Sequence, residues 1–180
     1  MPKRRFVILD RDGTIIVERH YLSDPDQITL TEGAIEGLTY LAKLGFGLII
    51  VTNQSAIARG FFNIETLDAI HERLKEILRS HDIEIDGIYY CPHHPNDGCA
   101  CRKPEPGLLN IASIEFDFDT KDCFVIGDNV SDIELGKRIQ AQTILVKTGY
   151  GKTVSDNTLT HPDYTVANLH DAAQIIGTLA

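Results

Sequence analysis

Apolar and polar residues alternate along the chain in blocks of two kinds. Short apolar runs predict strands at residues 6–9, 48–51 and 123–126, and additional strands are predicted at residues 87–90, 143–146 and 164–166. Apolar residues recur with helical spacing at residues 34–44, 64–78, 133–139 and 168–179. Strands that alternate with helices form a parallel sheet covered on both faces. The pattern therefore predicts an α/β fold, a three-layer sandwich with a Rossmann-like parallel sheet.

Helical spacing is clearest at residues 64–78, where one apolar stripe consists of Leu67, Ile70, Leu74, Ile77 and Leu78. We interpret this stripe as core and not as a ligand-binding surface. Gly45 predicts the end of the first helix. Ser131 and Glu134 have the spacing of a capping box, which predicts the start of the helix that follows Asp128.

The length of 180 residues suits one domain with a full core, and no linker or internal repeat divides the chain. We therefore expect a single domain over residues 1–180. No apolar segment approaches the roughly 20 residues of a membrane span, and the run that follows Lys3, Arg4 and Arg5 is too short for a signal peptide. These features predict a cytoplasmic protein.

The net charge of −9 disfavours nucleic acid as the main partner, because phosphate backbones repel an acidic surface. An acidic protein still binds a small anion where a metal ion and a few basic residues create one positive spot. We therefore expect no nucleic-acid partner and no membrane partner, and we expect the chain to be a monomer.

Polar residues follow three of the predicted strands directly. Asp10 follows residues 6–9, Thr52 follows residues 48–51, and Asp128 lies just after residues 123–126. Since open α/β sheets bind ligands at the carboxyl ends of their strands, we expect these side chains to converge. A strand-end carboxylate can act as a nucleophile, and Asp12, two residues after Asp10, can serve as acid and base across the tight turn that Gly13 permits.

Three of the four cysteines lie within eleven positions, and a histidine lies among them. Cys91, His93, Cys99 and Cys101 offer three thiolates and one imidazole, which predicts a closed tetrahedral Zn²⁺ site with a structural role in a loop at residues 91–101. Such a site would fix the segment that continues to residues 102 and 103. The fourth cysteine, Cys123, lies in an apolar run and is expected in the core.

The segment 10–14, Asp-Arg-Asp-Gly-Thr, resembles the first motif of the haloacid dehalogenase (HAD) superfamily. The other motifs of that superfamily match in order at Thr52, at Lys103 and at residues 127–132. The resemblance implies that Asp10 attacks phosphorus, that Asp12 protonates the leaving group and then activates water, and that Thr52 and Lys103 hold phosphoryl oxygens. It also implies a catalytic Mg²⁺ bound by the carboxylates of Asp10 and Asp128 and by the backbone carbonyl of Asp12.

Within the superfamily, residues 52–60 resemble the heptose 1,7-bisphosphate 7-phosphatases more than the histidinol-phosphate phosphatases. This resemblance implies hydrolysis of the 7-phosphate of D-glycero-D-manno-heptose 1,7-bisphosphate, in nucleotide-activated heptose biosynthesis such as that for lipopolysaccharide. The intervals 15–31 and 60–90 leave no room for a large cap domain, so we expect a capless HAD-like enzyme. The implied substrate contacts are Glu18, Arg19, His20, Tyr21, Thr52, Asn53, Gln54, Ser55, Arg59, Arg102, Lys103 and Asn129.

Two positions depart from the heptose pattern. Asn129 stands where a lysine is frequent, and Ile16 stands where asparagine is frequent, which puts the anomer preference in doubt. Histidinol phosphate or another small sugar phosphate stays an alternative substrate. A phosphoacceptor signalling domain would not place an acid/base such as Asp12 beside its acyl phosphate. A zinc-stabilised binding module without activity would not need the complete set of motif residues.

Overall fold

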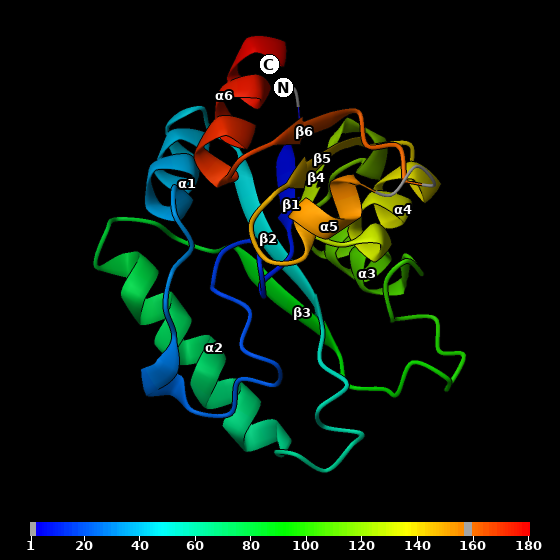
Figure 1. Ribbon diagram of the computed structural model, residues 1–180. Coiled ribbons are helices and arrows are strands. Elements are labelled where there is room, and N and C mark those ends of the chain that lie inside the picture. The colour runs from blue at the N-terminus through cyan, green and yellow to red at the C-terminus, as the bar shows by residue number, and fades with distance from the viewer. Residues whose placement is uncertain (1–2, 157–159) are drawn as a thin grey trace.

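The computed structural model describes residues 3–156 and 160–180, and these form a six-stranded sheet in the order β3-β2-β1-β4-β5-β6 (Figure 1). Every neighbouring pair of strands is parallel. The strands are β1 (Phe6–Leu9), β2 (Gly47–Asn53), β3 (Gly87–Cys91), β4 (Phe124–Gly127), β5 (Gln142–Val146) and β6 (Tyr164–Val166).

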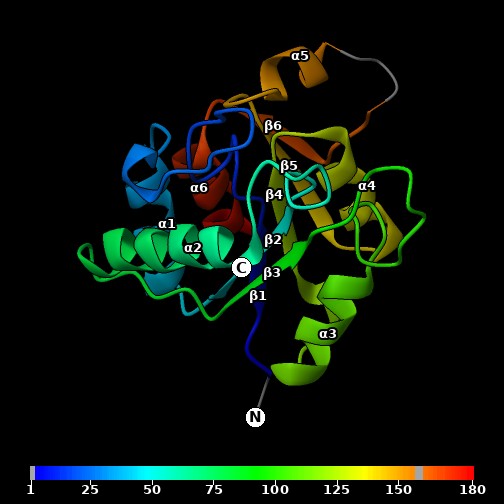
Figure 2. The same ribbon diagram turned by 90° about the horizontal axis from the view of Figure 1, so that it is seen from below.

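Helices cover both faces of the sheet (Figure 2). One face packs against α1 (Ala34–Lys43), α2 (Ile64–Arg79) and α6 (Leu169–Leu179), and the other packs against α3 (Gly107–Glu115) and α4 (Val130–Arg138). Successive residues of β1 point to opposite faces, since Val7 and Leu9 join one apolar cluster and Phe6 and Ile8 join the other. The predicted three-layer α/β sandwich is confirmed.

All six predicted strands and four predicted helices are present, with ends within three residues of the predicted ones. The sequence pattern did not predict α3, α5 (Gly151–Ser155) or the 3₁₀ turns Pro25–Gln27 and Thr120–Asp122. The predicted capping box was wrong. The N-cap of α4 is Asn129, whose backbone N–H donates to the carboxylate of Asp132 (3.0 Å), because the chain turns into the helix directly after β4.

The strand order reverses at the centre of the sheet. From β1 the chain moves outward through β2 to β3, and then returns to the other side of β1 to form β4, β5 and β6. The carboxyl ends of β1 and β4 therefore border the crevice at which doubly wound sheets bind their ligands. Within the described residues, the segment 15–31 that crosses this edge holds only the turn Pro25–Gln27, so no cap layer covers the crevice.

None of the helices in the described part of the chain has the length and apolar character of a membrane span.

Candidate active site

The predicted strand-end residues come together in one cleft at the carboxyl edge of the sheet. Asp10 follows β1, Thr52 lies at the end of β2, and Asp128 follows β4. The cleft is lined by Asp10, Arg11, Asp12, Glu18, His20, Tyr21, Leu22, Thr52, Asn53, Gln54, Ser55, Arg102, Lys103, Asp128, Asn129, Ser131 and Tyr150.

Lys103 is the central cation of the cleft, and 5% of its surface is exposed. Its Nζ donates to Asp10 Oδ1 (2.9 Å), to Asp132 Oδ1 (2.7 Å) and to the backbone carbonyl of Val51 (2.6 Å). Burial alone disfavours the cation, but the negative charges of Asp10 and Asp132 outweigh that effect and raise the pKa of Lys103. The lysine therefore stays charged beside the carboxylate that the motif assigns as nucleophile.

Three carboxyl groups lie close together where β1 and β4 end, two of them lining the cleft and the third just behind it. One oxygen each of Asp10, Asp128 and Asp132 lies within 4.8 Å of the others. Burial raises the pKa of Asp10 to about 7, against the opposing charge of Lys103. Burial, followed by the negative charges of Asp10 and Asp132, raises the pKa of Asp128 to about 9. A cluster of buried oxygens that resists ionisation by itself has the donor chemistry of a site for a hard divalent cation.

Two glycines and one backbone N–H fix the side chain of Asp128. Gly13 has φ +83°, and a Cβ there would lie 2.1 Å from Asp128 Oδ2. A Cβ at Gly149 would lie at the same distance from that oxygen, and the backbone N–H of Tyr150 donates to it (2.7 Å). Gly13 therefore supplies both the left-handed turn and the space that brings β1 and β4 carboxylates together.

Asp12 is held by donors on two sides. Arg11 donates to both of its oxygens, from Nε to Oδ2 and from Nη2 to Oδ1, each at 3.0 Å. Gln54 Nε2 donates to Asp12 Oδ2 (2.9 Å) and to Thr52 Oγ1 (2.8 Å). The end of β2 is thereby tied to the acid/base candidate after β1.

The residues expected to contact substrate divide into two groups. Most line the cleft, but the structure leaves Arg19 and Arg59 outside the lining. Arg19 bonds Thr29 Oγ1 (3.0 Å), and Arg59 stacks over the ring of Tyr21 with 6.0 Å to its centroid. Asn53 lines the cleft, but its side-chain amide is hydrogen-bonded to the backbone of Lys103. Nδ2 donates to the carbonyl of Lys103 (3.2 Å), and Oδ1 accepts from its N–H (3.0 Å). Asn53 thus positions the lysine.

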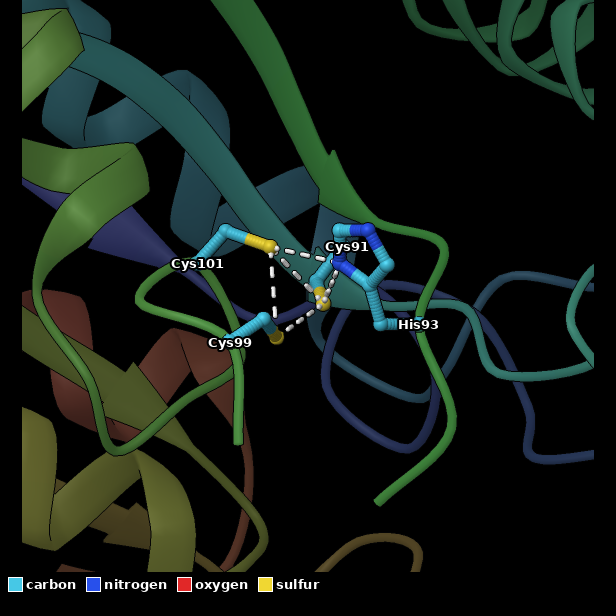
Figure 3. Close-up of side chains that lie close together, drawn as sticks. All are labelled: Cys91, His93, Cys99 and Cys101. Carbon is cyan, nitrogen blue, oxygen red and sulfur yellow. Dashed lines mark hydrogen bonds between the residues drawn. The ribbon is translucent and has the colours of Figure 1, made fainter. Parts of the chain in front are cut away.

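The predicted metal-binding loop brings its four ligand candidates together (Figure 3). Cys91 Sγ lies 3.6 Å from both His93 Nδ1 and Cys99 Sγ. Cys101 Sγ lies 3.0 Å from His93 Nδ1, 3.1 Å from Cys91 Sγ and 3.5 Å from Cys99 Sγ. Four ligands bonded to one Zn²⁺ ion would be about 3.8 Å apart. The spacing and the donor set both fit a tetrahedral zinc site, and the cysteines form no disulfide.

The sequence analysis assigned no role in the cleft or its surroundings to Asp132, Arg11, His71 or Tyr150. Asp132 has a signal in the sequence, because its spacing of four from Asp128 places it in the first turn of α4 beside the strand end. Arg11 lies inside the first motif, and His71 interrupts the apolar stripe of α2 at an inward position. Tyr150 lies in the segment after β5, where no pattern indicates a site.

Comparison with known proteins gives the family. The "HAD-hydrolase-like" family model matches residues 100–172. The D-glycero-beta-D-manno-heptose-1,7-bisphosphate 7-phosphatase of Pasteurella multocida is 36% identical over 180 residues, which covers 96% of this chain and 97% of the relative. The enzyme of the same name from Pseudomonas aeruginosa is 37% identical over 166 residues, covering 89% and 93%. The chain belongs to this family of HAD phosphatases.

Solved structures agree with that assignment. The D,D-heptose 1,7-bisphosphate phosphatase from B. bronchiseptica, crystallised with magnesium and phosphate, superposes with a TM-score of 0.89 at 31% identity, covering 98% of this chain and 99% of that one. The enzyme from Burkholderia thailandensis gives 0.74 at 27% identity, covering 98% and 99%. The family and the capless HAD-like fold expected from the motifs are confirmed.

Proposed function

We propose that this protein hydrolyses the 7-phosphate of D-glycero-D-manno-heptose 1,7-bisphosphate through a phosphoaspartate on Asp10. The observation that carries the proposal is the convergence of Asp10, Asp12, Thr52 and Lys103, from separate strand ends and loops, in one open cleft of a chain that belongs to this phosphatase family. The roles in nucleotide-activated heptose biosynthesis and the cytoplasmic location stay parts of the same proposal.

The reaction divides into two displacements at phosphorus. In the first, a carboxylate oxygen of Asp10 bonds to phosphorus while the bond from phosphorus to the sugar oxygen breaks, and Asp12 gives that oxygen a proton. In the second, Asp12 takes a proton from water, the water oxygen bonds to phosphorus, and the bond to Asp10 breaks. Lys103 and Thr52 hold the phosphoryl oxygens in both steps, which keeps the attacking and leaving oxygens in line.

The carboxylates at the base of the cleft fit Mg²⁺. Asp10, which is half-buried, and Asp128, which is buried, offer oxygen donors that lie close together, and the backbone carbonyl of Asp12 is the third expected ligand. When bound, the cation offsets the charge that builds on the phosphoryl oxygens. Asp132, by contrast, bonds Lys103 and the backbone N–H of Asn129, so we assign it to holding the lysine.

The loop at residues 91–101 fits Zn²⁺ with a structural role. Cys91, His93, Cys99 and Cys101 fill a complete tetrahedral set, which leaves no open position for a substrate. Burial raises the pKa of Cys91 to about 12, so the thiolate that a metal needs forms there through metal binding itself. The loop is fastened to the active site, because the backbone N–H of Gln54 donates to the carbonyl of Cys91 (2.7 Å).

Arg102 is the candidate for the second phosphate. Its Nη1 is buried and has no hydrogen-bond partner among residues 3–156 and 160–180, and its side chain lies between the cleft and the adjoining groove beside Cys99. A buried guanidinium nitrogen without an acceptor is costly, and a phosphate is an acceptor that satisfies it. Arg59 is exposed and outside the lining, so the structure favours Arg102 over Arg59 for this role.

The test compares substrates with magnesium present. Heptose 1,7-bisphosphate should be cleaved with a kcat/KM at least about tenfold above that of histidinol phosphate, which needs only about 1.4 kcal/mol of differential transition-state stabilisation. Phosphorus NMR should show that the 1-phosphate remains on the sugar. Arg102→Ala should lower kcat/KM for the bisphosphate by about tenfold, and Arg59→Ala by less.

The controls separate the substrate from the mechanism. A sugar monophosphate carries no second phosphate, so Arg102→Ala should change its hydrolysis little. If histidinol phosphate is the better substrate, or if Arg102→Ala impairs both kinds of substrate equally, the substrate assignment is wrong while the phosphatase mechanism stands.

A further inference from the structure

Arg11 is a fully buried cation between the two aspartates of the first motif. Only 1% of its surface is exposed. Buried charges in proteins are paired because an isolated one costs several kcal/mol. Arg11 Nε and Nη2 donate to the two carboxylate oxygens of Asp12, each at 3.0 Å, and Arg11 Nη1 lies 3.0 Å from His71 Nε2.

His71 projects from the inward side of α2 toward Arg11. It is 6% exposed and belongs to the buried side of the helix with Ile70 and Leu74. The ring of Tyr90, from β3, packs against it with 5.9 Å between centroids. A guanidinium has donors only, so His71 Nε2 must accept the hydrogen bond and the ring proton must lie on Nδ1. The histidine is therefore a neutral acceptor locked between a helix and a strand.

This arrangement leaves Arg11 few conformations. The bidentate fork sets the rotation of the Asp12 carboxylate, and the bond to His71 sets the orientation of the fork itself. Asp12 has 18% of its side chain exposed, and it lines the cleft, so its exposed part is available to a leaving group or a water molecule. A displacement of about 1 Å in such a group can cost a large part of its catalytic contribution.

We propose that His71 and Arg11 are positioning residues, which act through one another to hold the carboxylate of Asp12 in the orientation required for proton transfer. The proposal rests on the proposed function, in which Asp12 is the acid and base. The competing account is that Arg11 only neutralises Asp12 and that His71 only fills space in the core. The two accounts differ in what happens when the acceptor at position 71 is removed without loss of volume.

A matched pair of variants isolates that acceptor. His71→Leu removes the nitrogen and keeps an apolar side chain of similar size, whereas His71→Gln keeps an acceptor oxygen near the place of Nε2. Ile70→Val, on the adjacent position of α2, removes one buried methylene and leaves the acceptor untouched. It reports the effect of loosening the helix alone.

Two substrates separate the acid role of Asp12 from its base role. A sugar phosphate needs a proton on its leaving oxygen, whereas p-nitrophenyl phosphate releases a stable anion and needs none. With p-nitrophenyl phosphate, a misplaced Asp12 therefore slows only the hydrolysis of the phosphoaspartate. The expected signature is a burst of p-nitrophenol, and the burst amplitude counts the correctly folded active sites, so unfolding cannot imitate a loss of positioning.

For His71→Leu we expect kcat on the sugar bisphosphate to fall by about tenfold, while KM changes by less than about twofold. A tenfold loss is a part of the 10²–10⁴-fold rate enhancement that acid–base catalysis supplies. The variant should also show the burst of p-nitrophenol. His71→Gln should recover at least about half of the wild-type kcat, and Ile70→Val should show neither the loss nor the burst.

Each other result overturns the inference. An unchanged kcat in His71→Leu, an equal loss in His71→Gln, or the same loss in Ile70→Val would show that the acceptor does not position Asp12. If the wild-type protein turns over p-nitrophenyl phosphate but not the bisphosphate, the proposed substrate is wrong and the variants still decide the inference on p-nitrophenyl phosphate. If the wild type turns over neither, the proposed function and this inference are both wrong.

Discussion

Asp10 carries opposing electrostatic demands. Burial favours its neutral form and raises its pKa to about 7, while Lys103, 2.9 Å away, favours the carboxylate that a nucleophile requires. Lys103 in turn is balanced by Asp132, which adds a second carboxylate without lining the cleft. The two carboxylates keep the lysine charged, although the negative charge of Asp132 also raises the pKa of Asp10. A divalent cation at the cluster would shift Asp10 toward its carboxylate form.

Asp10→Asn should abolish turnover and preserve the fold. The amide has the shape of the carboxyl group but is not a nucleophile. Burial raises the pKa of Asp10, which means that this position favours a neutral group, so the free energy of unfolding should stay within about 1 kcal/mol of wild type. Phosphate release and urea unfolding measure the two effects. Asp132→Asn is the matched control, which should keep a reduced activity. Turnover in Asp10→Asn above about 5% of wild type would exclude the phosphoaspartate mechanism.

His71 should make the protein sensitive to mild acid. Burial, followed by the positive charge of Arg11, lowers the pKa of His71 from 6.5 to about 3. The charge of Lys75 lowers this pKa further, whereas the negative charge of Asp12 raises it. Between these values the unfolded chain binds a proton that the folded protein does not, so stability is complete above pH 6.5 and declines by up to about 1.4 kcal/mol per unit as the pH falls. His71 also lines a surface groove between α2 and β3, and the other titratable groups of that groove are Asp68, Glu72, Lys75, Asp86 and Tyr90.

The measurement compares urea unfolding at about pH 7.5 and about pH 5.5. His71→Gln has no titrating ring, so its acid-induced loss of stability should be smaller than that of wild type by about 1 kcal/mol. Since both proteins share every other titratable group, the difference isolates the histidine. Equal losses in the two proteins would contradict the buried neutral histidine.

The sequence could place some site residues and not others, for a physical reason. Asp10, Thr52 and Asp128 follow apolar runs, and parallel strands bring their carboxyl ends to one edge. His71 belongs to a helix, where an inward polar residue has the same spacing as the apolar residues around it, and its partner Arg11 lies 60 positions away in sequence. Only the packing of α2 against the edge that follows β1 shows that the two side chains meet.

At the scale of elements, periodicity succeeded where a helix has one buried side. It failed for α3, because that helix is apolar all round: Leu108, Leu109 and Ala112 are buried, while Ile111 and Ile114 are 56% and 83% exposed. It failed for α5 because five residues are too few to show a period. The central strands β1, β2 and β4 were predicted well, since a strand covered on both faces is a nearly continuous apolar run.

The metal-binding loop is an element without regular structure, and its stability should depend on zinc. One zinc ion should copurify per chain, and Cys99→Ser should lose it and lower the unfolding temperature by several degrees, because the free energy of metal binding becomes free energy of folding. Metal analysis and thermal unfolding with and without a chelator measure this. Catalysis per folded molecule should change less, since Asn53, at the end of β2, holds the backbone of Lys103 independently of the loop.

Cys123→Ser is the matched control for the zinc prediction. Cys123 is a buried cysteine outside the loop, in the apolar cluster on the α3 side of the sheet. Its replacement should lower stability by placing a hydroxyl in the core, but the zinc content and the effect of the chelator should stay as in wild type. Protein purified without chelators that contains no zinc would refute the structural metal site.

At the scale of the whole molecule, the strand order decides where chemistry occurs. Periodicity identifies strands but not their neighbours, so the sequence predicted convergence at an edge without predicting that β1 and β4 are adjacent. That adjacency brings Asp10 and Asp128 together, and Gly13 and Gly149 make the approach sterically possible. The site is thus a property of the topology as much as of the motifs.

Charge is the second property of the whole molecule, and it predicts an absolute need for a divalent cation. The chain has a net charge of −9, and the cleft itself is lined by four acidic residues (Asp10, Asp12, Glu18 and Asp128) against three basic ones (Arg11, Arg102 and Lys103). Without metal, burial already disfavours ionisation of Asp10, and the carboxylate that a nucleophile requires would also repel an incoming phosphate dianion. Repulsion between unit charges about 4 Å apart costs about 4 kcal/mol near a protein surface, more than a single contact restores.

EDTA-treated protein should therefore lose phosphatase activity and regain it with Mg²⁺ but not with Zn²⁺ alone, because the carboxylate cluster around Asp10 offers only oxygen donors. The zinc loop lies outside this cleft, so thermal unfolding in the same samples shows whether EDTA has also stripped the structural site. Asp128→Asn should raise the Mg²⁺ concentration for half-maximal activity by about tenfold or more, since it removes one charged ligand from the cation. Glu18→Gln removes a lining charge that is not among the carboxylates grouped around Asp10, and it should leave that concentration within about twofold of wild type. Full activity after complete removal of divalent cations, or equal shifts in the two variants, would show that the cleft neutralises the phosphate with its own residues.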